Sequence, residues 1–251
     1  MIPISDANRT QRFPFVNLSL ILVNILVFLY EVTLSNSLTL TQTTRDLVMF
    51  FNQWAVVPSE YTGGPSVPPD VTPVFLTLFT AMFMHGSLLH IGSNMLFLWV
   101  FGDNVESNMG HLKYLVFYLI SGVLASAAHI LFNLGSAVPS LGASGAIAGV
   151  LGAYLVLFPR AQVRTLIILF IFITMTRVSA VVLIGIWFLL QFAQGIIELG
   201  MPRGETGGVA VWAHVGGFIA GVLLVFVFRG RRKRFERGDY VAGPPGTGYS
   251  S

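Results

Sequence analysis

Long apolar runs separated by polar segments dominate this chain. A helix needs about 20 mostly apolar residues to cross the hydrocarbon core of a bilayer. The runs that we expect to cross the membrane cover residues 15–34, 74–101, 114–134, 144–158, 178–197 and 211–228. The pattern therefore predicts an all-α, polytopic membrane protein, folded as a bundle of six transmembrane helices.

The stretch around Arg177 decides the number of spans. Residues 165–176 are also apolar, so this stretch together with 178–197 would give seven spans and place the chain ends on opposite sides. A single span here gives six spans, with both ends on one side. In that case all of the 14 Lys and Arg residues except Arg45 and Arg203 lie on the same side. Because cytoplasmic loops carry the excess of basic residues, we expect six spans with both termini in the cytoplasm.

The segments outside the spans predict one membrane domain with a tail at each end. We expect a cytoplasmic N-terminal tail over residues 1–14, the membrane domain over 15–229, and a cytoplasmic C-terminal tail over 230–251. The C-terminal tail begins with basic residues. Its remainder is rich in Gly, Pro and Ser, so we expect it to be disordered. An apolar, aromatic patch at 47–57 suits a segment that lies in the membrane interface.

Composition and charge agree with a membrane protein. Hydrophobic residues make up 54% of the chain and charged residues 10%, against about 25% charged in soluble domains. The net charge of +3 does not indicate a nucleic-acid partner, because the basic residues flank apolar segments. The chain contains no cysteine, which excludes disulfides, thiolate metal sites and cysteine nucleophiles.

The fourth span is too short to cross a bilayer. Residues 144–158 form a helix of about 22 Å, whereas the hydrocarbon core is about 30 Å thick. This helix must begin inside the membrane, where free backbone N–H groups are tolerated only if they are buried in protein or line a wet cavity. Ser144 stands at that start, within Gly142-Ala143-Ser144-Gly145. The site suits an activated serine; the alternative is that Ser144 only caps the helix and the glycines allow close packing.

His214 strengthens the catalytic interpretation. On a helix it shares one face with Gly217 and Gly221, and Gly145 belongs to a similar small-residue face on the fourth span. Two such faces allow close approach, which would bring His214 to Ser144 and create a serine–histidine dyad. A histidine bonded to a backbone carbonyl is the alternative. Every acidic residue falls at a span end, in a loop or in a tail, so we expect no triad.

Three further polar residues, His85, His90 and Asn94, lie within the long 74–101 run. His90 and Asn94 are four residues apart, hence on one helix face, and could donate hydrogen bonds to a developing oxyanion together with the backbone N–H of Ser144. Metal binding by His85, His90 and His214 is the alternative. No acid or cysteine joins these histidines, and the spacing of His85 and His90 does not fit one helix face, so we expect neither a metal nor a cofactor.

These residues together resemble the rhomboid family of intramembrane serine proteases. The resemblance implies a six-helix fold of rhomboid type with cytoplasmic termini, Ser144 as nucleophile, His214 as general base, and His90, Asn94 and the Ser144 N–H as oxyanion donors. Many members carry an aromatic residue one turn after the serine, where this chain has Ala148. The resemblance also implies a structural role for Glu106. The motifs that carry the resemblance, in family order, are His85-Gly86 with His90 and Asn94, then Gly102, Glu106 and Gly110, then Gly142 to Gly145, then Ala213-His214 with Gly217 and Gly221.

The resemblance implies an endopeptidase whose substrates are single-span membrane proteins, cleaved near the outer face. A non-catalytic membrane chaperone or adaptor that binds single-span clients is the competing hypothesis. A transporter is disfavoured because no acidic residue lies in mid-span and no inverted repeat is visible. Because no targeting extension precedes the first span, we expect a bacterial plasma membrane; the sequence indicates no oligomeric state.

Overall fold

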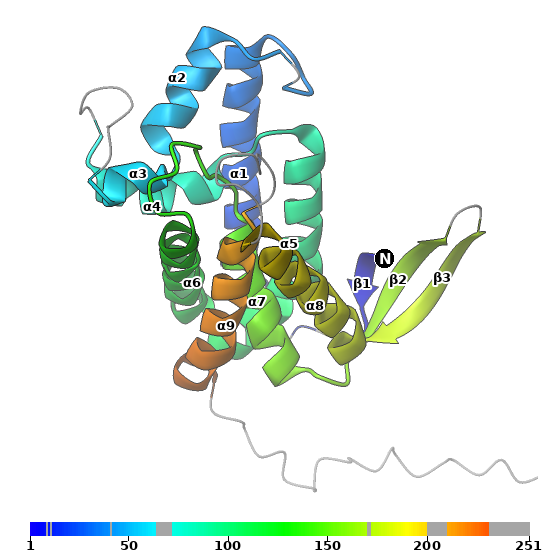
Figure 1. Cartoon of the computed structure of the whole chain (residues 1–251). Coiled ribbons are helices and arrows are strands. Elements are labelled where there is room, and N and C mark those ends of the chain that lie inside the picture. Colours follow the sequence, from blue (N-terminus) through cyan, green and yellow to red (C-terminus); the bar gives the residue numbers. More distant parts are fainter. Residues whose placement is uncertain are drawn as a thin grey trace, which may run out of the picture.

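The computed structural model shows a helical bundle from which a small sheet projects (Figure 1). It describes residues 1–8, 10, 12–40, 42–63, 72–169, 172–199 and 210–230. The expected C-terminal tail falls outside these residues from 231 onward, as does Arg203. The elements are β1 Ile2–Asp6, α1 Phe15–Ser35, α2 Arg45–Trp54, α3 Pro58–Tyr61, α4 Val74–Thr80, η1 Ala81–Phe83, α5 Leu88–Met109, α6 His111–Phe132, α7 Ser144–Leu157, β2 Gln162–Leu169, β3 Phe172–Ser179, α8 Ala180–Leu199 and α9 Val211–Phe228.

The chain is a mostly helical, polytopic membrane protein. Within the described residues, α1, α6, α8 and α9 are each long and apolar enough to cross a membrane. A fifth candidate is the bent pair formed by Val74–Phe83 and Leu88–Met109, and α7 is a shorter apolar helix. Six spans require both of these to be counted, so the number six stays a prediction.

The run at 74–101, which we expect to cross the membrane, is bent into two helical parts. Its two parts meet at an angle of 82°. The break has a local cause, because the Ser87 hydroxyl accepts a hydrogen bond from the backbone N–H of His90 at 3.2 Å and thereby starts a new helix. Gly86 lies in the connection between the two parts. The bend places His90 near the beginning of α5.

The all-α expectation is wrong for residues 162–179, which form the antiparallel hairpin β2–β3. Val163 pairs with Val178, and Thr165 with Thr176, so β-branched residues face each other across the hairpin. Such residues favour strands because their side chains pack well on a pleated surface. Helix α8 begins directly after β3, which also excludes a helical span over 165–176.

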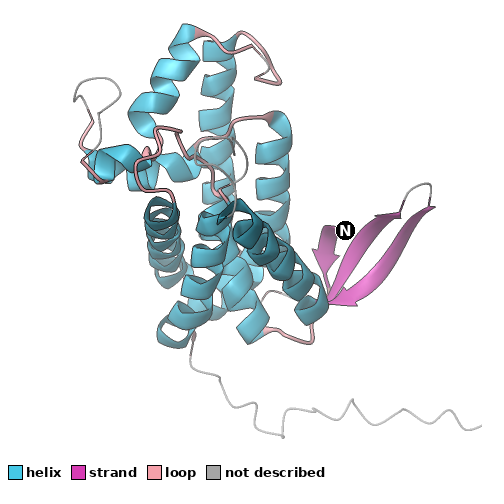
Figure 2. Ribbon diagram, in the orientation of Figure 1, coloured by secondary structure: helices cyan, strands magenta, loops and turns pink. Residues whose placement is uncertain are grey.

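The strand β1 completes a three-stranded sheet in the order β1–β2–β3, which stands out to one side of the helices (Figure 2). We expected its residues to belong to a cytoplasmic tail. Asp6 anchors the strand to the bundle: its carboxylate accepts hydrogen bonds from the Tyr154 hydroxyl at 2.5 Å and from the Asn104 amide at 2.8 Å. Burial raises the pKa of Asp6, and these hydrogen bonds oppose that shift.

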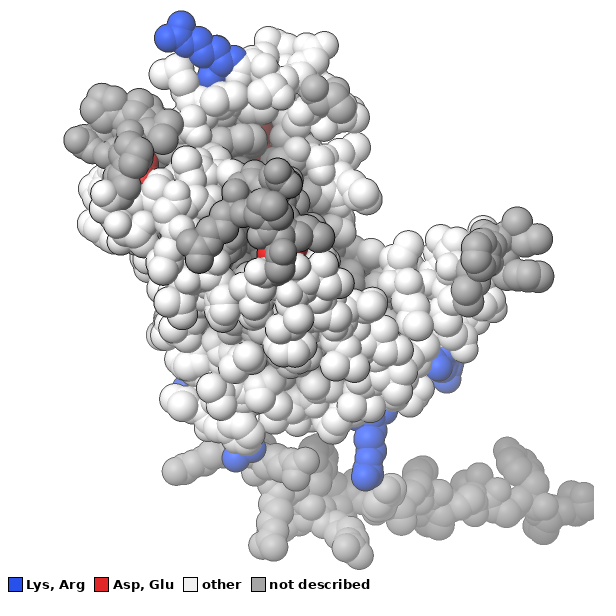
Figure 3. All heavy atoms as spheres, in the orientation of Figure 1, with Lys and Arg blue, Asp and Glu red and all other residues white. Residues whose placement is uncertain are grey.

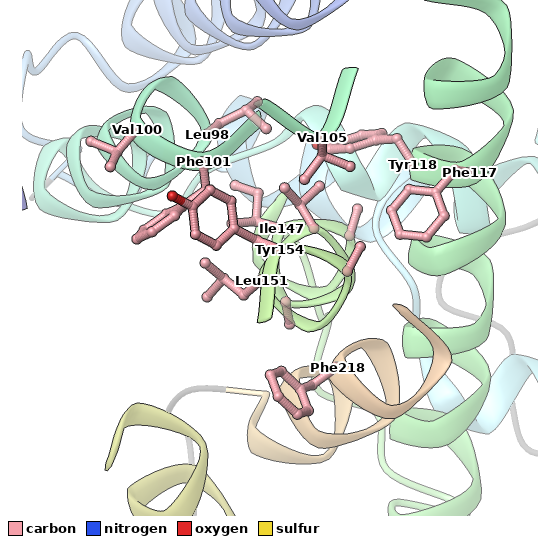
Figure 4. Close-up of a cluster of buried hydrophobic side chains, with 14 of the residues drawn as sticks. Leu98, Val100, Phe101, Val105, Phe117, Tyr118, Ile147, Leu151, Tyr154 and Phe218 are labelled. Atoms are coloured by element: carbon pink, nitrogen blue, oxygen red, sulfur yellow. The ribbon is translucent and has the colours of Figure 1, made fainter. Parts of the chain in front are cut away.

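Helix α7 lies at the centre of the bundle. Every residue from Gly145 to Tyr154 is buried, and large side chains of α5 and α6 pack around it (Figure 4). Phe101 of α5 meets Tyr154 edge-on with ring centroids 4.9 Å apart. Neighbouring helices cover α7 along most of its length. Its N-terminal end, at Ser144, faces the site described below.

Glu106, near the C-terminal end of α5, contacts the first turn of α1; its structural role stays a prediction. Its carboxylate accepts hydrogen bonds from the backbone N–H groups of Val16 at 3.0 Å and Asn17 at 2.7 Å, in the first turn of α1. The His111 ring contacts the same carboxylate at 2.5 Å. A helix N-terminus leaves such N–H groups without intrahelical partners, so Glu106 acts as the cap of α1 from another helix.

Candidate active site

The loop that leads into α7 is held in place by backbone hydrogen bonds to the opposite loop. Val56 and Ser140 form an isolated β-bridge, with N–H to O distances of 2.9 and 2.7 Å. The Gly142 N–H donates to the Ala81 carbonyl at 2.8 Å. Ser144, which follows two residues later, therefore starts its helix from a fixed point.

Ser144 and His214 lie together, as the sequence predicts. The distance from His214 Nε2 to Ser144 Oγ is 2.7 Å, although the residues are 70 positions apart in the chain. Ser144 begins α7 and His214 lies in the first turn of α9. The His214 side chain is buried, with 7% of its surface exposed. A hydroxyl and an imidazole in this arrangement form the minimal unit for nucleophilic catalysis.

Glycines allow the two helices to approach at backbone distance. A Cβ atom added to Gly217 would collide with the carbonyl oxygen of Gly145, and one added to Gly221 would collide with that of Gly149. The paired small faces expected from the sequence thus meet each other directly. Because the backbones touch, the first turn of α9 comes within hydrogen-bond reach of Ser144.

His90 presents a hydrogen-bond donor toward Ser144. The backbone N–H of Gly86 donates to His90 Nδ1 at 3.4 Å. A nitrogen that accepts a hydrogen bond carries no hydrogen, so the neutral ring has its N–H at Nε2. That atom faces Gly142, where an added Cβ would lie 2.8 Å from it and 3.6 Å from Ser144 Oγ. Only glycine leaves open the space between His90 and Ser144.

Gly142 also has a backbone conformation that other residues rarely adopt. Its φ is +130°, in the region where a Cβ atom clashes with the backbone. Two independent requirements, the conformation and the open space, therefore account for glycine at this position.

Asn94 places a second donor at the same site. It lies on α5 one turn after His90, and both residues line the cavity that contains Ser144 and His214. The Asn94 side-chain nitrogen is buried and has no hydrogen-bond partner among the described residues. A buried donor without a partner is costly, so a ligand oxygen bound in the cavity would satisfy it.

His85 lies beside His90 without lining the cavity. Its backbone N–H donates to the Glu31 carboxylate at 3.1 and 3.2 Å, and its fully buried ring lies edge-on to that of His90, with centroids 5.0 Å apart. These contacts place His85 between Glu31 of α1 and the ring of His90, and its structural role stays a prediction. Within the described residues, no group of three or more His, Cys, Asp or Glu side chains could hold a metal ion.

The cavity over these residues has a volume of about 1160 Å³. It is larger than the roughly 300–1,000 Å³ that typical small-molecule pockets enclose. Its lining includes the polar residues His90, Asn94, Ser144 and His214. Apolar side chains such as Phe97, Leu151 and Trp212 also line it. This combination suits an extended apolar chain with a polar backbone.

The sequence argument missed the residues of α8 that contact His214. The side-chain oxygen of Gln191 lies 2.7 Å from His214 Nδ1, and the Trp187 ring lies 5.9 Å from the His214 ring between centroids. These two residues are four positions apart and share a face of α8. A signal existed, because Gln191 is a polar residue within an apolar span, but the only partners considered for the histidine besides Ser144 were acidic residues and a backbone carbonyl.

The sequence matches the Rhomboid domain over residues 73–231. Over 175 residues, or 67% of this chain and 46% of the relative, it is 33% identical to the mitochondrial Rhomboid protein 1 of Saccharomyces cerevisiae. RHOMBOID-like protein 1 of Arabidopsis thaliana is 32% identical over 60% of this chain and 34% of its own length. Rhomboid protease GluP of Bacillus subtilis is 34% identical over 59% of this chain and 25% of its own length. The chain thus spans less than half the length of these relatives.

Proposed function

This chain belongs to the rhomboid family, and we propose that it is an intramembrane serine endopeptidase with a Ser144–His214 dyad. Its substrates would be single-span membrane proteins, cut in their transmembrane segments near the outer face of the bilayer. One relative is named a protease, whereas others are named only as rhomboid or rhomboid-like proteins. The proposal is therefore argued from the residues of this chain.

The observation that carries the proposal is the hydrogen bond between His214 Nε2 and Ser144 Oγ at 2.7 Å, inside a cavity lined by His90 and Asn94. A helix cap does not require an imidazole partner, and a binding groove requires neither residue. A nucleophile, a base and two donors meeting at one point are what acyl transfer needs.

In the proposed mechanism, Ser144 Oγ attacks the carbonyl carbon of the scissile peptide while His214 Nε2 takes the hydroxyl proton. The carbonyl oxygen becomes an oxyanion, which His90 Nε2–H, Asn94 Nδ2–H and the Ser144 backbone N–H stabilise. His214 then gives its proton to the leaving amine as the C–N bond breaks. Water, activated by His214, hydrolyses the acyl-enzyme and restores Ser144.

The substrate must be unwound where it is cut. A transmembrane helix already uses its carbonyl oxygens in its own hydrogen bonds, so they cannot accept from oxyanion donors. Segments with small or helix-breaking residues near the membrane surface unwind at lower cost. We therefore expect cleavage near such residues.

Reconstitution tests the function. The purified chain is mixed with candidate single-span reporters in detergent and in proteoliposomes, and mass spectrometry locates any cut. We expect a single cut near the outer end of the reporter's transmembrane segment, made by the wild type and absent with Ser144→Ala. An adaptor without catalytic activity would instead retain uncut reporter in pull-down experiments with both proteins.

Replacing Asn94 tests the oxyanion site. We expect Asn94→Ala to lower kcat by about 10²–10³-fold, because one donor to the transition state is lost, and to change KM little. Steady-state kinetics on the reporter measure both constants. Asn108→Ala is the matched control, since Asn108 lies lower on the same helix and accepts a hydrogen bond from the Gly230 backbone N–H. An unchanged kcat in Asn94→Ala would remove Asn94 from the mechanism.

We also propose six spans with both chain ends in the cytoplasm of a bacterial cell. Basic side chains of the described residues gather at the lower end of the bundle, and one group lies at the upper end above α2 (Figure 3), the helix that begins at Arg45. Such asymmetry favours an orientation with the lower end inside.

Single cysteines test this orientation without background labelling, because the chain has none of its own. Thr43 and Lys113 are both exposed and lie before α2 and in the first turn of α6, respectively. A membrane-impermeant maleimide should label Thr43→Cys from outside the plasma membrane and Lys113→Cys only in inverted vesicles. The opposite result would reverse the proposed orientation.

A further inference from the structure

His214 has hydrogen-bond partners at both ring nitrogens. Nε2 contacts Ser144 Oγ at 2.7 Å, and Nδ1 contacts the side-chain oxygen of Gln191 at 2.7 Å. The three residues come from three different helices, α7, α9 and α8. They form a continuous line from Gln191 through the imidazole to the serine hydroxyl.

We infer that Gln191 is the positioning residue of this site, which holds His214 in the tautomer and orientation that a general base requires. This inference rests on the proposed peptidase function, and it adds to that function a third residue that orients the base of the dyad. Gln191 touches neither Ser144 nor a reacting atom, and it acts through His214.

The hydrogen-bond chemistry supports one tautomer. An amide oxygen only accepts, so the short contact with Gln191 requires the hydrogen of the imidazole on Nδ1. The lone pair of the neutral ring is then on Nε2, which faces the Ser144 hydroxyl. Without an acceptor at Nδ1, the other tautomer would place its hydrogen between Nε2 and Oγ, where it blocks proton transfer.

Other side chains around His214 do not supply this acceptor. His90 of α5, His129 of α6 and Glu198 of α8 line the same cavity, but among the described residues the ring nitrogens of His214 bond only to Ser144 and Gln191. A neutral amide accepts the Nδ1 hydrogen without placing a charge in the bilayer, where a carboxylate is costly.

The orientation of the ring also depends on α8. Ala148, one turn after Ser144, is too small to pack firmly against an imidazole, and it lines the cavity. The Trp187 ring, from the same face of α8 as Gln191, lies 5.9 Å from the His214 ring at an angle of 41°. Phe188 of α8 stacks on Phe218 of α9 with ring centroids 4.4 Å apart. Stacking fixes α8 beside α9, and Gln191 then fixes the direction of the ring.

The test compares two nearly equal-sized replacements of Gln191. Gln191→Leu removes the acceptor, and we expect kcat to fall about 10²-fold, the cost of a base held in the wrong geometry, with KM nearly unchanged. Gln191→Glu keeps an acceptor oxygen and should recover much of that loss. Gln194→Leu is the control, because Gln194 lies on the same helix, is exposed, and bonds to Glu198.

A spectroscopic measurement separates positioning from folding. With ¹⁵N-labelled histidine, NMR of the Ser144→Ala background should show the hydrogen of His214 on Nδ1, and adding Gln191→Leu should shift the population toward Nε2–H. A tautomer and a kcat that do not change in the Gln191→Leu proteins would overturn the inference. If Ser144→Ala cleaves as fast as the wild type, the proposed function fails instead, so the two failures are distinguishable.

Discussion

Ser144→Ala should abolish peptide-bond cleavage while leaving the fold intact. Removing the nucleophile eliminates the covalent pathway, so we expect kcat to fall by about 10³-fold or more. The N-cap residue of α7 is Ala143, which makes no side-chain cap hydrogen bond, and the Ser144 hydroxyl contacts His214. Alanine at position 144 lacks only this hydroxyl, so the thermal midpoint should move little. Initial rates on a single-span reporter and circular dichroism melts in detergent measure the two effects.

Ser19→Ala provides the matched control, because its hydroxyl bonds to the Phe15 carbonyl on the exposed side of α1. This variant should retain wild-type activity. A fluorophosphonate probe should label the wild type and Ser19→Ala but not Ser144→Ala. Cleavage by Ser144→Ala at the wild-type rate would exclude the dyad mechanism and leave client binding as the function of the cavity.

Gly221→Ala should force α7 and α9 apart. The added Cβ would lie 2.6 Å from the Cα atom of Gly149 and closer still to its carbonyl oxygen. Neither backbone can yield within its own helix, so the helices must separate, and we expect a loss of stability of about 3 kcal/mol. Separation also lengthens the Ser144–His214 hydrogen bond, and a displacement of about 1 Å costs about 10²-fold in rate.

Gly185→Ala distinguishes this packing effect from a general effect of removing glycine. A Cβ at Gly185 of α8 would meet nothing within 4 Å, so that variant should keep its stability and its rate. Thermal unfolding in detergent and reporter kinetics are measured for both. Equal stability of Gly221→Ala and Gly185→Ala would show that the contact between α7 and α9 tolerates a methyl group and does not set the position of His214.

The apolar runs predicted most helices because their signal lies within each segment. The short helix at 144–158 appears as Ser144–Leu157, and the run at 211–228 appears as Val211–Phe228. The hairpin at 162–179 was missed because a short apolar run does not distinguish a buried helix from a strand by periodicity. Its β-branched residues were the available clue. The 82° bend before α5 depends on the Ser87 cap, which an apolar run conceals.

The candidate site was predicted where it depends on spacing along one helix. His90 and Asn94 line the cavity together, and the glycine face below His214 meets the one below Ser144, as the spacings indicate. The contact between Gln191 and His214 was not predicted, because their separation of 23 residues has no fixed geometric meaning. Ala148 is too small to support the His214 ring from α7. The sequence does not show which other helix supports the ring.

By itself, the sequence determined that this protein is built from membrane-crossing helices and that a serine and a histidine stand on small-residue faces able to meet. Length, hydropathy and helical spacing are local properties, so they can be read from one segment without knowing which segments pack against it. The tertiary structure alone decided the sheet beside the bundle, the angle at which α5 begins, and the approach of α8 that brings Gln191 to the imidazole. These depend on how several helices fill one volume at the same time, and packing of that kind is a property of the whole chain.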